Sequence, residues 1–148
     1  MTKRPQSFWN DYFMRMADHT ATASKDPSTQ VGCVLVDDKR RIVGMGYNGF
    51  PRGVDDKRER LLHRPTKYLM VQHAEVNAVL NAVAGTRDAT AYVTHRPCAS
   101  CSGILIQAGI RKIVTRKPER GFAERFAESF AAADAMLSEA GVELEMVW

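Results

Sequence analysis

Two short segments of this chain carry the residue types that bind a transition metal while leaving one coordination position open. They are His73-Ala74-Glu75 and Pro97-Cys98-Ala99-Ser100-Cys101. Zinc prefers histidine nitrogen and cysteine sulfur, and three protein ligands leave a fourth position for water, as catalytic zinc sites require. The metal lowers the pKa of that water to about 7. We therefore interpret His73 and the two cysteines as zinc ligands, and Glu75, which is left over, as a general acid and base.

The same spacing is typical of one class of enzymes. H-x-E followed by P-C-x-x-C occurs in zinc-dependent nucleobase deaminases, where the glutamate moves protons and does not bind the metal. A C-x-x-C pair by itself would also fit a redox pair or half of a structural zinc site. A structural site would need a fourth ligand, and the remaining candidates, Cys33, His19, His63 and His95, have no obvious pairing with another ligand. The combined motifs therefore favour a catalytic zinc.

Both motifs are predicted to lie at the start of a helix. Proline is favoured at the first position of a helix, so Pro97 predicts that Cys98 and Cys101 occupy the opening turn and, at i and i+3, share one face. The partial positive charge of a helix N-terminus favours the thiolates that zinc binds. His73 begins a periodic apolar run that ends at Gly85. We expect the two helix starts to converge on the metal.

The composition predicts a single domain spanning residues 1–148. With 148 residues, 45% of them hydrophobic, the chain has enough apolar material for one core. No apolar run approaches the roughly 20 residues that cross a bilayer, and the first residues lack the apolar core of a secretory signal. A cytoplasmic location is expected, with no membrane partner. The formal net charge of +4 is compatible with anionic partners, but the basic residues are interspersed with acidic ones, so solvated surface is the default interpretation and nucleic acid is not expected.

The hydrophobic periodicity predicts alternating helices and strands. An amphipathic helix with Ser7 as its N-cap is expected at the start, and another helix within residues 122–140. A long irregular polar loop is expected from Asn48 to Lys67. The remaining expected elements are strands at 31–36, 42–47, 91–94, 112–115 and 142–147, and the helices of the two metal motifs, the second running to Gly109. This order predicts an α/β fold in which helices flank a mixed five-stranded sheet.

Further segments are more specific than the metal motifs. They are Ser24-Lys25-Asp26-Pro27-Ser28-Thr29-Gln30-Val31-Gly32, Gly46-Tyr47-Asn48-Gly49-Phe50-Pro51-Arg52-Gly53, Lys67-Tyr68 and Ile106-Gln107-Ala108-Gly109-Ile110. With these segments the chain resembles the deoxycytidylate (dCMP) deaminase family, within the zinc-dependent cytidine and deoxycytidylate deaminases. The resemblance implies a cytidine-deaminase-like three-layer sandwich with Zn2+ as cofactor. It also implies hydrolytic conversion of dCMP to dUMP and ammonia, which would supply dUMP for thymidylate synthesis.

The resemblance implies which positions bind the substrate. In the family, the backbone at the positions of Ala74 and Pro97 helps to hold the pyrimidine, and the residue at the position of Asn48 contacts the sugar. A 5'-phosphate needs a cationic or N–H-rich site. The resemblance assigns that site to Ser24 and Lys25.

The chain departs from the family pattern at two places. Ala23 replaces the arginine that often precedes the Ser-Lys pair, so Arg52 or Arg116 is expected to share the phosphate. Residues 116–120 stand where many members have an aromatic residue that helps to close the pocket. Members are commonly hexamers activated by dCTP and inhibited by dTTP, with an effector site around the loop that contains Gly49. A homo-oligomer and these two effectors are therefore predicted partners.

Other substrates and other classes of protein remain open. A 5-substituted dCMP, another cytosine nucleotide or a nucleoside would suit the same metal chemistry. A tRNA adenosine deaminase is disfavoured by the long segment between Asn48 and Lys67, and a riboflavin-pathway deaminase by the short spacing of the two motif cysteines. A non-catalytic zinc module would have no use for Glu75.

Overall fold

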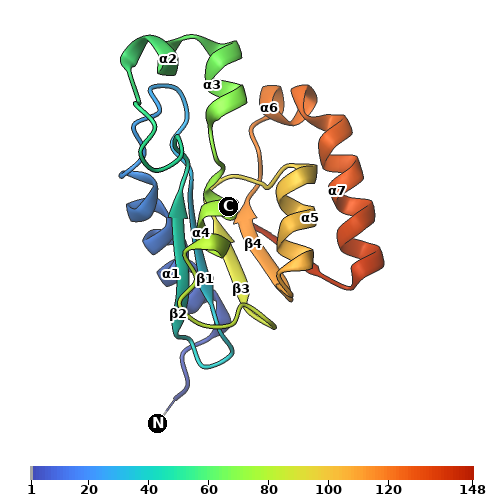
Figure 1. Ribbon diagram of the computed structural model, residues 1–148. Coiled ribbons are helices and arrows are strands. Elements are labelled where there is room, and N and C mark those ends of the chain that lie inside the picture. The colour runs from blue at the N-terminus through green and yellow to red at the C-terminus, as the bar shows by residue number, and fades with distance from the viewer. Residues whose placement is uncertain (1) are drawn as a thin grey trace.

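A mixed five-stranded sheet forms the centre of the molecule in the computed structural model, which describes residues 2–148 (Figure 1). The strands are β1 (Gly32–Val36), β2 (Ile42–Tyr47), β3 (Thr90–Val93), β4 (Lys112–Arg116) and β5 (Glu143–Val147). Their order across the sheet is β2-β1-β3-β4-β5. β1 pairs antiparallel with both β2 and β3, whereas β3, β4 and β5 run parallel. The predicted mixed five-stranded sheet is confirmed.

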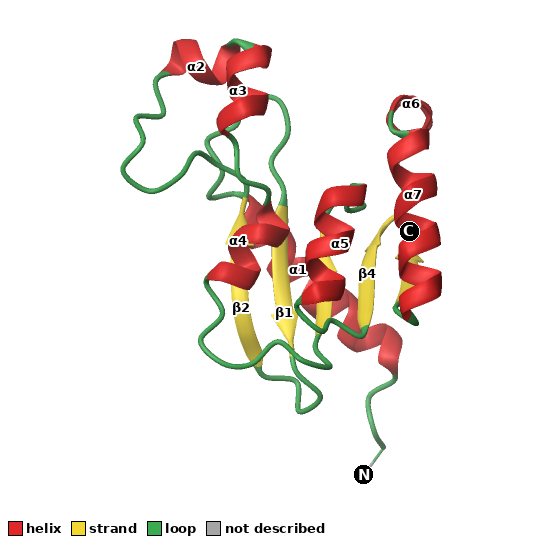
Figure 2. Cartoon of the chain, turned by 45° about the vertical axis from the view of Figure 1, so that its right-hand side comes forward, coloured by secondary structure: helices red, strands yellow, loops and turns green. Residues whose placement is uncertain are grey.

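Helices cover both faces of the sheet, which makes three layers (Figure 2). The helices are α1 (Gln6–Ala21), α2 (Arg58–Leu62), α3 (Arg64–Met70), α4 (Ala74–Leu80), α5 (Ala99–Gln107), α6 (Arg120–Arg125) and α7 (Ala127–Ala140). α1 packs against one face of the sheet and forms one core cluster with it. α4, α5 and α7 pack against the opposite face and form the other cluster. Among residues 2–148, no helix has the length and apolar character needed to span a bilayer.

The central strand β1 is buried on both of its faces. Cys33 and Leu35 lie in the core shared with α4, α5 and α7, whereas Val34 and Val36 lie in the core shared with α1. None of the four is more than 3% exposed. A strand covered on both faces reads as a continuous apolar run rather than an alternating one, which explains the sequence of β1.

Two glycines of β2 allow α4 to lie directly against the sheet. A Cβ atom at Gly46 would come within 2.3 Å of the backbone nitrogen of Ala78 and 2.5 Å of the backbone oxygen of Ala74. A Cβ atom at Gly44 would come within 2.5 Å of the Ala78 carbonyl oxygen. Glycine weakens a strand interior, but it permits this close backbone approach. The contact sets the position of α4, and with it the position of His73 at the start of that helix.

The structure corrects two predicted elements, the loop before the His73 motif and the end of the helix that follows it. The loop expected from Asn48 to Lys67 contains α2 and the first half of α3, with Pro65 in the first turn of α3, where its missing N–H costs nothing. The helix expected to run to Gly85 ends at Leu80. Val83 beyond it is 89% exposed, so the apolar run does not continue as a buried stripe.

Two further helix boundaries are corrected. α1 begins at Gln6 after Pro5, so Ser7 lies inside the helix and is not its N-cap. The single helix expected within residues 122–140 is two helices, α6 and α7, which meet at Phe126. Phe126 has φ −108° and ψ 17°, outside the α-helical range, and this break turns α6 away from the axis of α7.

Candidate active site

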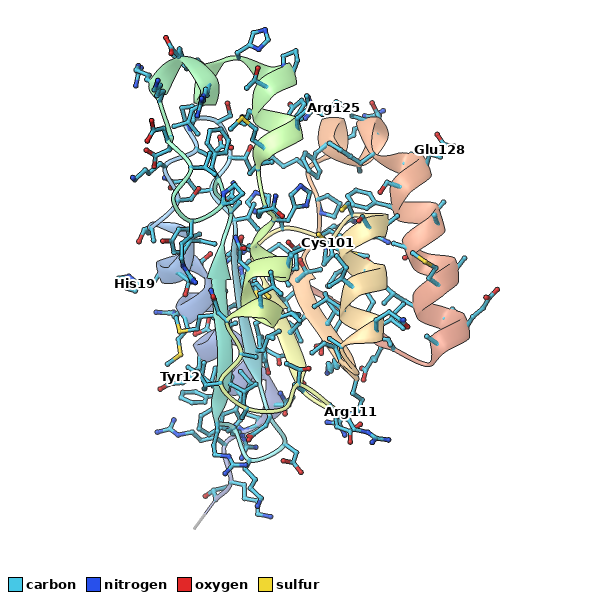
Figure 3. The ribbon with its side chains drawn as sticks, in the orientation of Figure 1. Tyr12, His19, Cys101, Arg111, Arg125 and Glu128 are labelled. Atoms are coloured by element: carbon cyan, nitrogen blue, oxygen red, sulfur yellow. The ribbon has the colours of Figure 1, made fainter. Side chains whose placement is uncertain are left out.

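The predicted metal ligands converge at the starts of two helices. His73 is the N-cap residue of α4, Cys98 is the N-cap residue of α5, and Cys101 lies in the first turn of α5 (Figure 3). α5 begins at Ala99, two residues after Pro97, so Pro97 is not its first residue, and it ends at Gln107 rather than Gly109. The Nδ1 atom of His73 lies 3.2 Å from Sγ of Cys101 and 3.8 Å from Sγ of Cys98.

This geometry fits a zinc ion. The three ligand atoms all lie within 4.8 Å of one another. Tetrahedral zinc, with Zn–S bonds of about 2.3 Å and Zn–N bonds of about 2.0 Å, holds its ligand atoms roughly 3.5–3.8 Å apart. One nitrogen and two sulfurs are also the donor set that zinc prefers. The described residues supply three ligands to this group, which leaves a position for a water molecule.

The electrostatics of the cluster suit a metal that replaces protons. The pKa of Cys98 is lowered to about 4, chiefly by the hydrogen bond from the Cys101 thiol and also by His73. The pKa of Cys101 is raised, because its proton is shared with Cys98 and its thiol is buried. The pKa of His73 is raised as well, mainly by its hydrogen bond with Cys98. The cluster therefore holds protons between its ligand atoms, and a zinc ion bound there would release them.

Glu75 lies beside this cluster and is almost completely removed from water. It is the second residue of α4 and is 4% exposed. The pKa of its carboxyl group is raised to about 7, chiefly because burial disfavours the charged form. A carboxyl group with a pKa near the working pH can both accept and donate a proton, as a general acid and base must.

A cavity of about 580 Å³ opens over Glu75 and the cluster. The cavity lies within the size range of small-molecule sites. Its floor is formed by His73, Ala74, Glu75 and Cys98, and its walls come from the segment after α1, from α3, and from α6 and the start of α7. A separate hollow of about 360 Å³ lies over Tyr12, Arg15, Met16, His19 and Met45, on α1 and β2, and contains none of the metal ligands.

Two residues assigned to substrate binding by the resemblance line the cavity. Ala74 is fully buried at its floor. Asn48 lies in its wall, and its side chain accepts from Val31 N at 2.8 Å and donates to the carbonyl of Thr29 at 2.9 Å. Asn48 therefore fixes the segment that leads into β1. Pro97 is buried between two cavity-lining residues, Arg96 and Cys98, and does not line the cavity itself.

The residues expected to hold a phosphate lie away from the cavity. The hydroxyl of Ser24 donates to the carbonyl of Asn48 at 2.9 Å and accepts from Asp26 N at 3.2 Å. Lys25 is exposed and forms an ion pair with Asp56, which raises the pKa of the lysine. Neither Ser24 nor Lys25 is among the residues that line the cavity.

The other three candidates for phosphate or effector contacts are also outside it. Arg52 donates to the side-chain oxygen of Asn81 at 3.1 Å. Arg116 makes two hydrogen bonds, of 2.7 Å and 2.6 Å, to the carboxylate of Asp18. Gly49 pairs with Gln72 in an isolated β-bridge beside the His73 motif.

Three groups of cavity residues were not predicted from the sequence. The first is a buried ion pair in which Nζ of Lys67 lies 3.2 Å from Oδ1 of Asp26. The second consists of Arg64 and Arg125 on the walls. The third is an aromatic wall formed by Phe122, Phe126 and Phe130. The spacing of these phenylalanines at i, i+4 and i+8 could have indicated that they share one face. The first of them, Phe122, comes two residues after the segment 116–120 that lacks the family aromatic.

The sequence comparisons identify relatives over most of the chain. Residues 7–117 match the family model described as the cytidine and deoxycytidylate deaminase zinc-binding region. A protein of Aliivibrio fischeri, named an uncharacterized deaminase in the luxG 3' region, is 41% identical over 138 residues, which are 93% of this chain and 92% of that protein. The deoxycytidylate deaminase of Mus musculus is 42% identical over 112 residues, which are 72% of this chain and 63% of the mouse protein.

The fold is shared with a solved structure. The crystal structure of dCMP deaminase from the cyanophage S-TIM5, in complex with dCMP and dUMP, matches with a TM-score of 0.78 and 24% identity, over 99% of this chain and 100% of the phage chain. That likeness confirms the three-layer α/β architecture. The family match over residues 7–117 and the relatives show that the chain belongs to the cytidine and deoxycytidylate deaminase family.

Proposed function

We propose that this protein hydrolyses dCMP to dUMP and ammonia. The observation that carries the proposal is the convergence of His73, Cys98 and Cys101 beside the buried carboxyl group of Glu75, on the floor of a cavity of about 580 Å³. The choice of dCMP is supported by the relative from Mus musculus, which is named deoxycytidylate deaminase, and by the phage structure named as holding dCMP and dUMP.

The chain's own residues account for the proton transfers. Zinc held by the three ligands would supply a water molecule that is acidic enough to react at neutral pH. Glu75, buried beside the three ligands, would hold the proton given up when that water reacts and would deliver protons to N3 of the cytosine and to the departing amino group. Ala74, which is fully buried, forms part of the cavity floor beside Glu75.

The substrate contacts follow from the cavity. We propose that the backbone at Ala74 and near Pro97 holds the pyrimidine, and that Asn48, held rigidly by its own hydrogen bonds, contacts the sugar. A preorganised contact of this kind positions a substrate at low entropic cost.

The test is ammonia release from zinc-loaded protein incubated with dCMP, CMP, deoxycytidine, dCTP and 5-methyl-dCMP. We expect dCMP to give the highest kcat/KM. Glu75→Gln should retain stoichiometric zinc. Its kcat should fall by roughly 10²- to 10⁴-fold, because glutamine cannot carry the proton. Turnover of deoxycytidine in preference to dCMP would refute the nucleotide assignment. A loss of less than about tenfold in the zinc-loaded variant would refute the role of Glu75.

We also propose that the chain assembles as a homo-oligomer, with a hexamer regulated by dCTP and dTTP as the specific form to test. The support is an exposed apolar strip on the edge strand β2 and on α1, where Tyr12, Met45 and Tyr47 are each 42–45% exposed. Exposed apolar surface of this kind is typical of interfaces. Light scattering with and without each nucleotide measures the assembly, and a monomer under all conditions would contradict it.

A further inference from the structure

The cavity carries two arginines on opposite walls that have no acidic partner among residues 2–148. Arg64 is the first residue of α3, and Arg125 is the last residue of α6; both line the cavity. Figure 3 shows Arg125 on the side of α6 that faces α3. Within residues 2–148, no carboxylate lies at ion-pair distance from either guanidinium group.

The other cations of the cavity are already neutralised. Lys67 pairs with Asp26, and both side chains are buried, at 5% and 7% exposure. Arg96 pairs with Asp134 and stacks on Phe130, with its guanidinium carbon 4.5 Å from the ring centroid. The uncompensated positive charge of the cavity therefore comes from Arg64 and Arg125. Such charge in a cleft raises the local concentration of an anion.

Arg125 is held in place without using its hydrogen-bond donors. Its guanidinium carbon lies 5.7 Å from the ring centroid of Phe122 and 5.5 Å from that of Phe126, which are cation–π contacts. An arginine stacked on aromatic rings keeps its N–H groups free. A planar fork of free donors is suited to bidentate recognition of a phosphate.

We propose that Arg64 and Arg125 together clamp the 5'-phosphate of the nucleotide substrate, and so determine the preference for a nucleoside monophosphate over a nucleoside. This inference rests on the proposed function. The amino group of the base must reach Glu75 and the metal ligands on the floor, and the phosphate, at the opposite end of the nucleotide, then lies between the two walls. Lys25 forms an ion pair with Asp56, and Arg116 forms one with Asp18. Their charges are therefore already compensated, unlike those of the two cavity arginines.

The test compares kcat/KM for dCMP and for deoxycytidine in zinc-loaded Arg64→Gln and Arg125→Gln. Each variant should lose roughly ten- to a hundredfold on dCMP, mainly through KM, because a charge-assisted hydrogen bond remote from the reacting atoms is lost. The rate on deoxycytidine should stay within about threefold, since that substrate has no phosphate to lose. Arg120→Gln is the matched control: it removes a charge from the same helix, but Arg120 is exposed and pairs with Glu124 outside the cavity.

A second measurement separates the clamp from the reaction. Binding of dCMP to zinc-loaded Glu75→Gln protein, measured by calorimetry, should weaken roughly tenfold or more when either cavity arginine is also replaced. Binding that depends on the arginines without turnover of dCMP by the wild type would support the clamp and refute the proposed function. Normal turnover of dCMP that is insensitive to both replacements, but sensitive to Lys25→Gln, would overturn the clamp and leave the proposed function standing. Absence of both binding and turnover of dCMP would overturn both.

Discussion

Replacing Glu75 by glutamine should make the metal-free protein more stable than the wild type above neutral pH. The carboxyl group is 4% exposed, and its pKa rises from 4.5 to about 7, chiefly because burial disfavours the charged form. Each tenfold change in proton affinity is equivalent to about 1.4 kcal/mol, so ionised Glu75 costs the folded protein about 3 kcal/mol. Glutamine has nearly the same shape and stays neutral.

Stability falls with rising pH because the unfolded state loses the Glu75 proton at a lower pH than the folded state does. Below pH 4.5 the carboxyl group is protonated in both the folded and unfolded states, and it has no effect on the pH dependence. Between pH 4.5 and about 7 the unfolded chain ionises while the folded one does not, so stability falls as the pH rises. Above that range the loss is complete. The glutamine variant lacks this loss, whereas contributions from His73 and Cys98 are present in both proteins and largely cancel in the comparison.

The assay is urea unfolding of both proteins after removal of metal with a chelator, at pH 5 and at pH 8. The variant should gain little at pH 5 and about 3 kcal/mol at pH 8. Equal stabilities at pH 8, or a less stable variant, would refute the conclusion that burial raises the pKa of Glu75. Metal-free protein is essential, because bound zinc would add its own charge beside the carboxylate.

Three further predictions concern the packing and the metal ligands. Gly46→Ala should destabilise the protein by about 1–3 kcal/mol and lower its zinc occupancy, because the new methyl group meets the backbone of α4. The control is Gly85→Ala, where a methyl group would point into open space. That variant should change the free energy of unfolding by less than about 0.5 kcal/mol. Lys67→Met should cost about 3–5 kcal/mol in urea unfolding because it leaves the buried carboxylate of Asp26 unpaired, and a cost below about 1 kcal/mol would contradict that ion pair. Cys98→Ala should lose zinc as well as activity, and stoichiometric zinc measured in the purified variant would exclude Cys98 as a ligand.

The sheet and the metal cluster could be predicted from the sequence because both depend on local patterns. Short β-rich runs indicated the five strands, and the order of helices and strands along the chain indicated a mixed sheet. The cluster followed from two helix starts, since a ligand at an N-cap and another in the first turn lie close together wherever the helix packs. Helix ends were less predictable. The apolar residues between Leu80 and Gly85 resemble a continuing helix, yet they are largely exposed in the folded chain.

The lining of the cavity depended on contacts between segments far apart in the chain. Arg64 and Arg125 come from short helices separated by some sixty residues, and no local pattern indicates that they face one space. Lys25 and Arg116 looked equally suitable in sequence, but each pairs with an acidic residue distant in the chain.

The sequence by itself determined the donor set of the metal site, the class of reaction and the layered α/β architecture. These features depend on residue types, on spacings of a few residues, and on hydrophobic periodicity. Only the tertiary structure decided that Glu75 titrates near neutrality and which cations remain free to meet a substrate. Both depend on burial and on long-range pairing of charges, which arise only when α3, α4 and α6 are brought around one cavity.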